Sequence, residues 1–318
     1  KAIIHQFSPA DTELLLADKF LNITPKIEEY LRKKIERVYS DEAKTGIFEP
    51  DNVFLAQLSD DLLETSVTVA KLWQEEFLVS ENQKTNDLIF VQFDKEGVEH
   101  FAFLRIALRE TLTHLGGEVD NPIKLTQNNL PGFGTGADEA LVINLQSRKY
   151  HLIEKRIKYN GAFLNYFSDN LLQVSPKVSP KKSIKTLEKT AQKIAESFNT
   201  DDFQFQSKVK SSIFKNLEEN EELSPEKLAD ELFDSNLTAR LTFIDQVKET
   251  VPEPIKFDEI DSSRQKKKFE NQKLSLSNGI ELIVPNNVYQ DAESVEFIQN
   301  DNGTYSILIK NIEDIQSK

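Results

Sequence analysis

The sequence predicts an α+β protein, with a mixed α/β N-terminal domain that contains antiparallel hairpins and a helical C-terminal domain closed by a small antiparallel sheet. Three observations support this prediction. Strand-length apolar runs separated by turn residues dominate the first half, segments with helical periodicity follow residue 182, and strand-length runs return after residue 278. A chain of 318 residues is typical of about two domains. We therefore expect an N-terminal α+β domain over residues 1–174 and a C-terminal helical domain with a terminal β-hairpin over residues 175–318.

The first elements are expected to be two strands and two helices. Ala2–Phe7 and Glu13–Ala17 are short apolar runs of strand length. Thr24 and Pro25 have the residue types of an N-cap and a first helical position, and apolar side chains recur at helical spacing after them. The same spacing predicts a second helix over Val53–Phe77.

Two antiparallel hairpins are expected next. Leu88–Phe93 and Val98–Ile106 are strand-like and are joined by a turn with Gly97 in the left-handed conformation. Leu141–Leu145 and Tyr150–Ile157 form the second pair.

Loop and linker residues mark the rest of the first half. Gly116–Gly136 is rich in Asn, Gly and Pro, and it is expected to be the longest loop there. Ala162–Leu172 returns to a helical pattern. Ser175–Lys182 contains two Ser-Pro steps, which prevent a helix from running through, and this stretch is the expected linker.

The C-terminal part is expected to be helical and then to end in strands. Ser224, Pro225 and Glu226 together form a helix start signal. The expected helices are Ser183–Phe198, Asp202–Leu217, Ser224–Phe233 and Leu237–Thr250. The expected strands are Gly279–Val284, Val295–Gln299 and Tyr305–Lys310, the last two joined by the turn Asn300–Gly303.

Composition excludes several classes of protein. Hydrophobic residues make up 38% and charged residues 29% of the chain, as in a globular rather than a disordered protein. The absence of Cys excludes disulfide frameworks, thiolate metal sites and cysteine nucleophiles. No apolar run is long enough for a membrane span. Lys1–Phe7 lacks the features of a signal peptide, so the expected compartment is the cytoplasm.

The charge is distributed unevenly along the chain. The net charge is −14, which argues against a simple basic DNA-coating protein. Residues 1–120 carry 13 basic and 23 acidic side chains, whereas residues 148–193 carry 11 basic and 3 acidic ones. Residues 264–273 add 5 basic side chains and 1 acidic one. A basic middle therefore lies between acidic segments.

Metal and catalytic motifs are weak in this sequence. The glycine cluster Gly132–Gly136 lacks the strand–loop–helix context of a phosphate-binding loop, so we interpret it as a mobile loop. No pair among His5, His100, His114 and His151 has metal-ligand spacing, and structural roles are favoured for all four. The adjacent carboxylates Asp60–Asp61 and Asp201–Asp202 lie near helix starts, where the helix dipole favours them without any catalytic role.

A row of lysines is the most informative feature. At about 100° per residue, Lys182, Lys185, Lys189 and Lys193 fall within about 80° on one side of the expected helix, in a row about 16 Å long. The opposite side carries Ile184, Leu187, Ala191, Ile194 and Phe198. An ordinary solvated face is one interpretation, and a surface that binds nucleic-acid phosphates is the other. Further candidates for the same role are Arg156, Lys158, Lys177, Lys181, Arg264, Lys266, Lys267 and Lys268.

The order of several segments resembles that of one known family. The segments are Ala2–Phe7, Tyr39–Phe48 with its Gly-hydrophobic-Phe ending, Leu88–Arg105, Ile153–Phe167, and Gly279–Val284 followed by Val295–Ile309. In this order they resemble the bacterial 37-kDa nucleoid-associated protein family (NdpA/YejK-like). The resemblance implies association with the nucleoid and no enzymatic activity. It supplies no catalytic residues.

These observations favour a cytoplasmic, nucleoid-associated DNA-binding protein without catalysis, cofactor or metal. Its basic strip would contact the phosphates of double-stranded DNA with little sequence preference, because no segment looks like a base-reading helix. Nucleoid proteins are possible further partners, and no membrane contact is expected. One alternative is an acidic protein-interaction module that recruits or modulates a nucleoid enzyme. A metal-dependent nuclease is the other.

Overall fold

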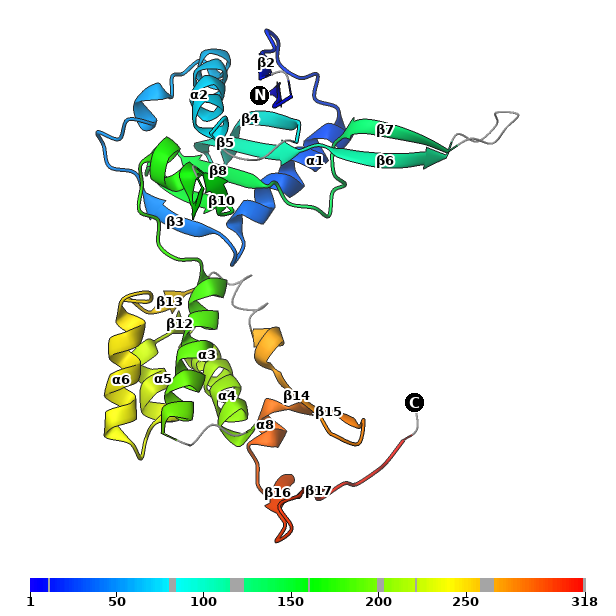
Figure 1. The fold of residues 1–318 in the computed structure, drawn as a ribbon, viewed down its shortest axis with the longest axis vertical. Coiled ribbons are helices and arrows are strands. Elements are labelled where there is room, and N and C mark those ends of the chain that lie inside the picture. The colour runs from blue at the N-terminus through cyan, green and yellow to red at the C-terminus, as the bar shows by residue number, and fades with distance from the viewer. Residues whose placement is uncertain are drawn as a thin grey trace. The chain divides into compact units, whose positions relative to one another are not determined.

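The computed structural model describes residues 1–10, 12–79, 84–114, 123–159, 161–198, 203–220, 222–257 and 266–316. The fold is α+β, with helices and antiparallel sheets, as the sequence predicts (Figure 1). The chain divides into two compact units, unit 1 over Lys1–Ser179 and unit 2 over Pro180–Lys318. Each unit has a hydrophobic core of its own.

A seven-stranded sheet forms the centre of unit 1. Its strand order is β2-β1-β4-β5-β8-β9-β3, and every neighbouring pair is antiparallel. The central strands are buried on both faces, which is why they read as nearly continuous apolar runs. The strands are β1 Ala2–Ser8, β2 Glu13–Leu15, β3 Lys44–Ile47, β4 Asn86–Lys95, β5 Val98–Ala107, β8 Glu139–Asn144 and β9 Lys149–Ile153.

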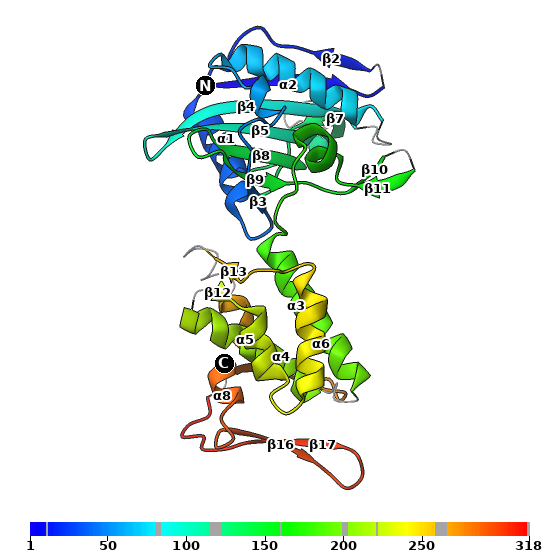
Figure 2. The ribbon, with the colours of Figure 1, turned by 90° about the vertical axis from the view of Figure 1, so that its left-hand side faces the viewer.

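Helices cover both faces of this sheet. On one face lies α1 (Pro25–Glu36), which continues into a short 3₁₀ turn, and on the other lie α2 (Leu62–Phe77) and the helical turns of η3 (Phe167–Leu172) (Figure 2). Alternate residues of one strand enter different cores, because successive side chains of a strand point to opposite faces. Thus Phe90 packs in the α2 core and Ile89 in the α1 core.

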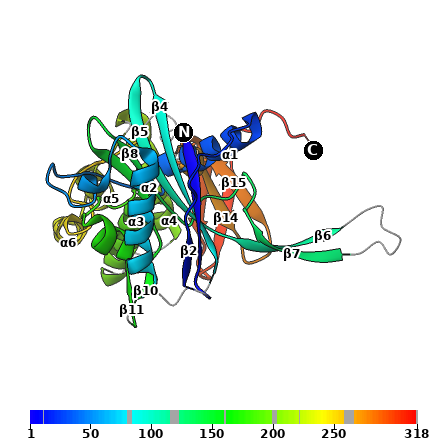
Figure 3. The same ribbon diagram turned by 90° about the horizontal axis from the view of Figure 1, so that it is seen from above.

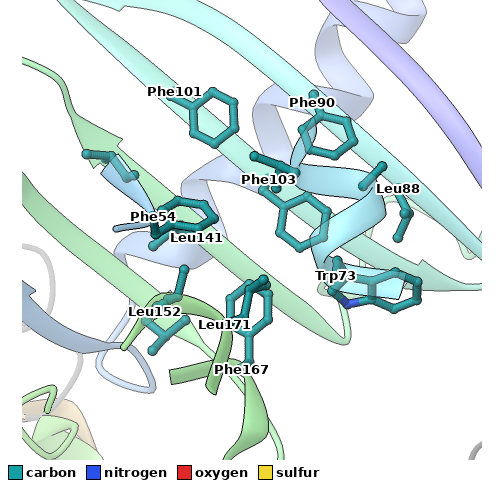
Figure 4. Packing of buried hydrophobic residues seen from close by; sticks show 14 of the residues in the cluster. Phe54, Trp73, Leu88, Phe90, Phe101, Phe103, Leu141, Leu152, Phe167 and Leu171 are labelled. Atoms are coloured by element: carbon teal, nitrogen blue, oxygen red, sulfur yellow. The ribbon is translucent and has the colours of Figure 1, made fainter. Parts of the chain in front are cut away.

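The α2 core is rich in aromatic rings. Figure 4 shows Trp73 of α2 and Phe167 of η3 beside Phe103 and Leu141 of the sheet. Trp73 and Phe167 are fully buried. Large aromatic side chains bury the most apolar surface per residue, so this cluster is expected to dominate the stability of unit 1.

The helix starts follow local capping chemistry. The Thr24 hydroxyl accepts a hydrogen bond from the amide of Ile27 at 3.4 Å, and the Asp61 carboxylate accepts one from the amide of Leu63 at 2.9 Å. The second cap corrects the prediction of one helix over Val53–Phe77. The structure has a 3₁₀ turn over Leu55–Gln57 and starts α2 only after Asp61.

Gly46 lies directly opposite Tyr150 on the neighbouring strand. A Cβ atom at Gly46 would collide with the Tyr150 ring, which is almost fully buried. This position therefore requires glycine, because only glycine leaves room for the ring.

The prediction of one long loop over Gly116–Gly136 is partly wrong. Strands β6 (Arg109–His114) and β7 (Ile123–Asn129) form an antiparallel hairpin (Figure 1). Polar residues such as Gln127 and Asn128 in β7 made this segment look like a loop. Residues 115–122 lie outside the described residues.

The helix expected over Ala162–Leu172 is wrong in its first part. Ala162–Leu164 is strand β11, which pairs with β10 (Ile157–Tyr159). Gly161 lies between the two strands at a φ of +80°. This left-handed turn brings the short apolar run back along β10 instead of starting a helix.

Four helices surround the core of unit 2, as expected. They are α3 (Pro180–Ser197), α4 (Phe203–Asn220), α5 (Pro225–Leu232) and α6 (Leu237–Lys248). The linker prediction is wrong at its end, since α3 already begins at Pro180 and includes Lys181 and Lys182. Proline is well tolerated in a first helical turn, so this Ser-Pro step starts the helix.

The C-terminal strands form separate hairpins. Strand β14 (Asn271–Ser275) pairs with β15 (Glu281–Pro285), and β16 (Val295–Gln299) pairs with β17 (Tyr305–Ile309). Two further short strands, Glu222–Leu223 and Ile255–Lys256, form the pair β12–β13.

A buried polar cluster ties β14 to α4. The Gln272 amide donates to the carbonyl of Ser207 at 2.9 Å and to Asn286 Oδ1 at 2.8 Å, and the Ser211 hydroxyl also donates to Asn286 Oδ1. Asn286 lies in the short helix α8 (Asn286–Tyr289), so the cluster joins α4, β14 and α8.

Candidate nucleic-acid interface

Four lysines line one side of α3 over about 16 Å at 1.5 Å per residue. We name Lys182, Lys185, Lys189 and Lys193 the lysine row, and all four side chains are exposed. The opposite stripe of α3 is buried and packs against α4 and α6. Among the described residues, Lys185, Lys189 and Lys193 form no salt bridge. The lysine row therefore presents several ammonium groups to solvent from one rigid helix.

Two carboxylates of α3 lie near the lysine row: the exposed Glu196, on the same side of the helix one turn beyond Lys193, and Glu188, which lies beside the row and is partly buried. Burial raises the pKa of the Glu188 carboxyl group above the ordinary value, and Lys268, Lys210 and Lys185 oppose this rise electrostatically. Charge–charge interactions of this kind act over short distances, so the three lysines, which belong to different segments, lie around the Glu188 carboxylate. Lys210 belongs to α4, and Lys268 belongs to the helical residues 266–269.

The second basic cluster of the sequence thus lies partly beside α3. Lys267 and Lys268 are exposed and Lys266 is half-buried. The Nζ atom of Lys268 lies 4.8 Å from the centre of the Phe269 ring, a cation–π distance that places the ammonium group at the edge of the core. Arg264 lies outside the described residues.

The remaining candidates divide between the two units. Lys181 is exposed and lies in the first turn of α3. Arg156, Lys158 and Lys177 belong to unit 1 and are exposed. The Arg156 guanidinium donates to the carbonyl of Phe163 at 2.5 Å and so braces the β10–β11 hairpin.

The carbonyl groups of the glycine cluster surround the ammonium group of Lys34. The Nζ atom of Lys34 donates to the carbonyls of Gly132, at 2.9 Å, and of Thr135, and the Tyr30 hydroxyl donates to the carbonyl of Pro131 at 3.0 Å. Lys34 is fully buried. A phosphate-binding loop would point amide N–H groups at its ligand. Here carbonyl oxygens point at an ammonium group, so this loop has the opposite polarity.

The Lys34 pKa is lowered to about 8, mainly because of burial. Arg37 and Arg109 lower it further by charge repulsion. The side chain shares the inner side of α1 with apolar residues. A cation in such a place is retained only because backbone carbonyls solvate it.

The histidines lie in strands. His5 and His100 are buried, and the His5 ring bonds to Ser66. In the part of the chain that the structure describes, no group of three or more His, Asp or Glu side chains could hold a metal ion. Asp61 serves as the N-cap of α2, and Asp201–Asp202 lie outside the described residues.

A buried charged network in unit 1 has no counterpart in the sequence motifs. The Arg105 guanidinium donates to Glu139 Oε2 at 2.7 Å, and the Tyr166 hydroxyl donates to the same oxygen at 2.5 Å. The Trp73 indole N–H donates to the Tyr166 oxygen at 3.0 Å. Burial, together with Glu139, raises the pKa of Tyr166 well above its ordinary value. No local sequence pattern could have revealed this network, because its four members come from β5, β8, α2 and the residue just before η3.

Lys210 was also missed as a member of the basic surface. It lies on α4, far in sequence from both basic clusters, and only the packing of α4 against α3 brings it to Glu188. An isolated lysine on an amphipathic helix carries no signal of this kind.

The comparisons with known proteins support one family. The sequence model of the family described as nucleoid-associated protein YejK matches residues 3–315, nearly the whole chain. No curated protein shows a match to the sequence. Across the described ranges, no helix is long and apolar enough to cross a membrane.

Proposed function

The chain belongs to the family of nucleoid-associated protein YejK, and on that premise we propose that it is a non-catalytic, cytoplasmic protein that binds double-stranded DNA through the lysine row. The observation that carries the proposal is the exposure of four lysines along one rigid helix, with Lys210 and Lys268 beside them. The family supports the nucleoid as the location, and the lysine row supports DNA phosphates as the ligand.

The dimensions of the lysine row suit a phosphate backbone. Phosphates of one DNA strand recur about every 3.4 Å along the helix axis, so a row of about 16 Å spans roughly five of them. Lysine ammonium groups are mobile point charges and contact phosphates without reading bases. We therefore expect binding that is sensitive to salt and tolerant of sequence.

The acidic remainder of the chain sets the limits of this binding. Residues 1–120 have a net charge of −10, and like charges repel DNA. The lysine row is therefore expected to supply the contacts with DNA, and residues 1–120 are expected to supply none.

A binding titration on the purified full chain tests the proposal. We expect retention of duplex DNA, with similar affinity for unrelated duplex sequences of equal length. Single-stranded DNA and RNA of the same length are the comparison ligands. Failure to retain any of them would contradict the proposal.

The acidic segments favour a second candidate, a protein-interaction module that recruits or modulates a nucleoid enzyme. The observation behind it is the charge of residues 1–120. This candidate predicts no retention of DNA by the isolated protein and capture of a basic nucleoid protein instead.

The absence of catalysis is a separate part of the proposal. Incubation with DNA or RNA and Mg²⁺ or Mn²⁺ is expected to leave the nucleic acid intact. Cleavage that disappears on Asp60→Asn would contradict it and would favour the nuclease alternative.

A further inference from the structure

The β10–β11 hairpin projects from the body of unit 1 as a short two-stranded ribbon (Figure 3). Ile157 lies directly opposite Leu164, and Lys158 lies directly opposite Phe163. Directly opposite residues share a face of a hairpin and successive residues alternate between its faces. These two pairs therefore lie on opposite faces of the ribbon.

One face of the hairpin is anchored to unit 1. Ile157 and Leu164 are partly buried and pack against the α2 core. The Arg156 guanidinium, just before β10, donates to the carbonyl of Phe163 on the opposite strand. The hairpin is thus held from its base, and the residues on its other face have a fixed support.

That other face presents a phenyl ring beside an ammonium group. The exposed fraction of Phe163 is 61%, higher than that of the other exposed aromatic side chains in the described part of the chain, Tyr305 at 50% and Phe20 at 44%. Lys158, the cross-strand neighbour of Phe163, is also exposed. A single exposed apolar side chain is ordinary on a protein surface. This one differs because it lies on a projecting ribbon next to a cation.

The charge of the segment around the ring has one sign. Residues 155–164 contain three cations and no carboxylate. Lys155 pairs with Asp138 at 3.3 Å. The carboxylate just before this segment, Glu154, is buried and pairs with Lys44 at 2.6 Å. An exposed apolar ring in basic surroundings suits a ligand with anionic groups outside and flat apolar faces inside, which is the chemistry of DNA phosphates and stacked bases.

We propose that Phe163 is a wedge that enters between two adjacent base pairs of duplex DNA from the minor groove, with Lys158 on a neighbouring phosphate. Proteins that bind the minor groove frequently insert an apolar side chain such as Phe between base steps, and the insertion bends the duplex by about 20–90°. The inference rests on the proposed DNA binding. It adds a second contact, in unit 1, that changes the shape of the DNA.

A preference among DNA structures follows from such a wedge. Insertion separates stacked bases, and this costs least where stacking is already broken. A duplex with two unpaired bases should therefore bind roughly tenfold more tightly than the matched duplex. The lysine row contacts phosphates alone and is expected to contribute no such preference.

The test measures the bending of a short duplex that carries fluorescent dyes at its two ends. Saturation with the full chain should raise the energy transfer, because bending brings the ends together. Phe163→Ala should abolish this rise, whereas Phe163→Leu keeps an apolar wedge and should retain most of it. Phe20→Ala is the matched control, because it removes the same ring from an exposed position within residues 1–120, and it should bend DNA like the wild type.

A salt titration on the same variants separates the wedge from the lysine row. Phe163→Ala removes no charge and should keep the slope of the wild type, whereas Lys158→Gln should lose about one unit of slope. A wild type that binds duplex DNA but leaves it straight, or a Phe163→Ala variant that bends it fully, would overturn the wedge and leave the lysine row in place. A wild type that retains no DNA would overturn both.

Discussion

The Nζ atom of Lys34 donates a hydrogen bond to the carbonyl oxygen of Gly132 over 2.9 Å, and so joins α1 to a segment 98 residues later. The carbonyl of Thr135 accepts from the same ammonium group. The glycine-rich segment, which looks mobile in the sequence, is therefore held by a buried cation.

Lys34→Met should release this segment. The variant keeps an apolar chain of similar length but removes all hydrogen bonds to the carbonyls. We expect faster hydrogen exchange at the amide of Thr135, which donates to the carbonyl of Gly132, and new proteolytic cleavage between Pro131 and Gly136. Lys71→Met is the control, since Lys71 is an exposed side chain of α2, on the other face of the sheet from α1. Equal exchange in both variants would show that Lys34 does not hold the segment.

His5 should make unit 1 sensitive to acid. Its Nδ1 atom accepts a hydrogen bond from the amide of Ala17 at 3.0 Å, so the ring proton resides on Nε2, beside the Ser66 hydroxyl. Burial lowers the pKa of His5 from 6.5 to about 4. Between these values the unfolded chain takes up a proton that the folded chain does not bind. The free energy of unfolding should therefore fall as the pH drops from 6.5 to 4, by on the order of 3 kcal/mol.

Denaturant unfolding of wild type and His5→Asn at several pH values measures this effect. Asparagine offers an oxygen to the amide of Ala17 but does not titrate. We expect the difference in stability between the two proteins to shrink below pH 6.5. A difference that is constant from pH 7 to about pH 4 would refute the assignment of this acid sensitivity to His5.

Removing only one member of the buried ion pair Arg105–Glu139 should strongly lower the free energy of unfolding. Arg105→Met leaves a buried carboxylate without its cation and is expected to destabilise unit 1 by about 3–5 kcal/mol. Arg105→Met with Glu139→Leu removes both charges and should recover much of this loss. Chemical denaturation of the two single variants and the double variant gives the coupling energy. Additive losses would mean that the two side chains do not depend on one another.

Local patterns predicted much of the fold. The β4–β5 hairpin, the caps at Thr24 and Ser224, and the amphipathic face of α3 all depend on residues close in sequence. Periodicity and capping chemistry are visible over such short distances.

The missed features depend on contacts between distant segments. The β6–β7 hairpin contains few apolar residues, and most of its side chains are exposed. The apolar pattern that usually predicts a strand is therefore weak there. Lys34 has the ordinary residue type of a solvent-exposed helix position, and only the carbonyls of a distant loop make its burial favourable. Lys210 and Lys268 approach Glu188 through tertiary packing alone.

The central claim is that the lysine row binds the phosphates of DNA, and the salt dependence of duplex binding tests it most directly. The logarithm of the association constant should fall with the logarithm of salt concentration, with a slope of about −0.9 per phosphate neutralised. Changing Lys182, Lys185, Lys189 and Lys193 to Gln keeps good helix formers on an exposed face, so the fold should persist. This variant should lose roughly three to four units of slope and bind all duplex sequences less tightly.

Pairs of lysines provide the matched comparison in the same measurement. Lys185→Gln with Lys189→Gln should lose about two units of slope. Lys227→Gln with Lys248→Gln removes the same charge from exposed positions on α5 and α6, outside the lysine row, and should change the slope little. A loss of slope that is largest in the fourfold variant, smaller in Lys185→Gln with Lys189→Gln, and smallest in the control would support the lysine row as the DNA-binding surface. An unchanged slope in the fourfold variant, or no salt-sensitive binding by the wild type, would contradict it.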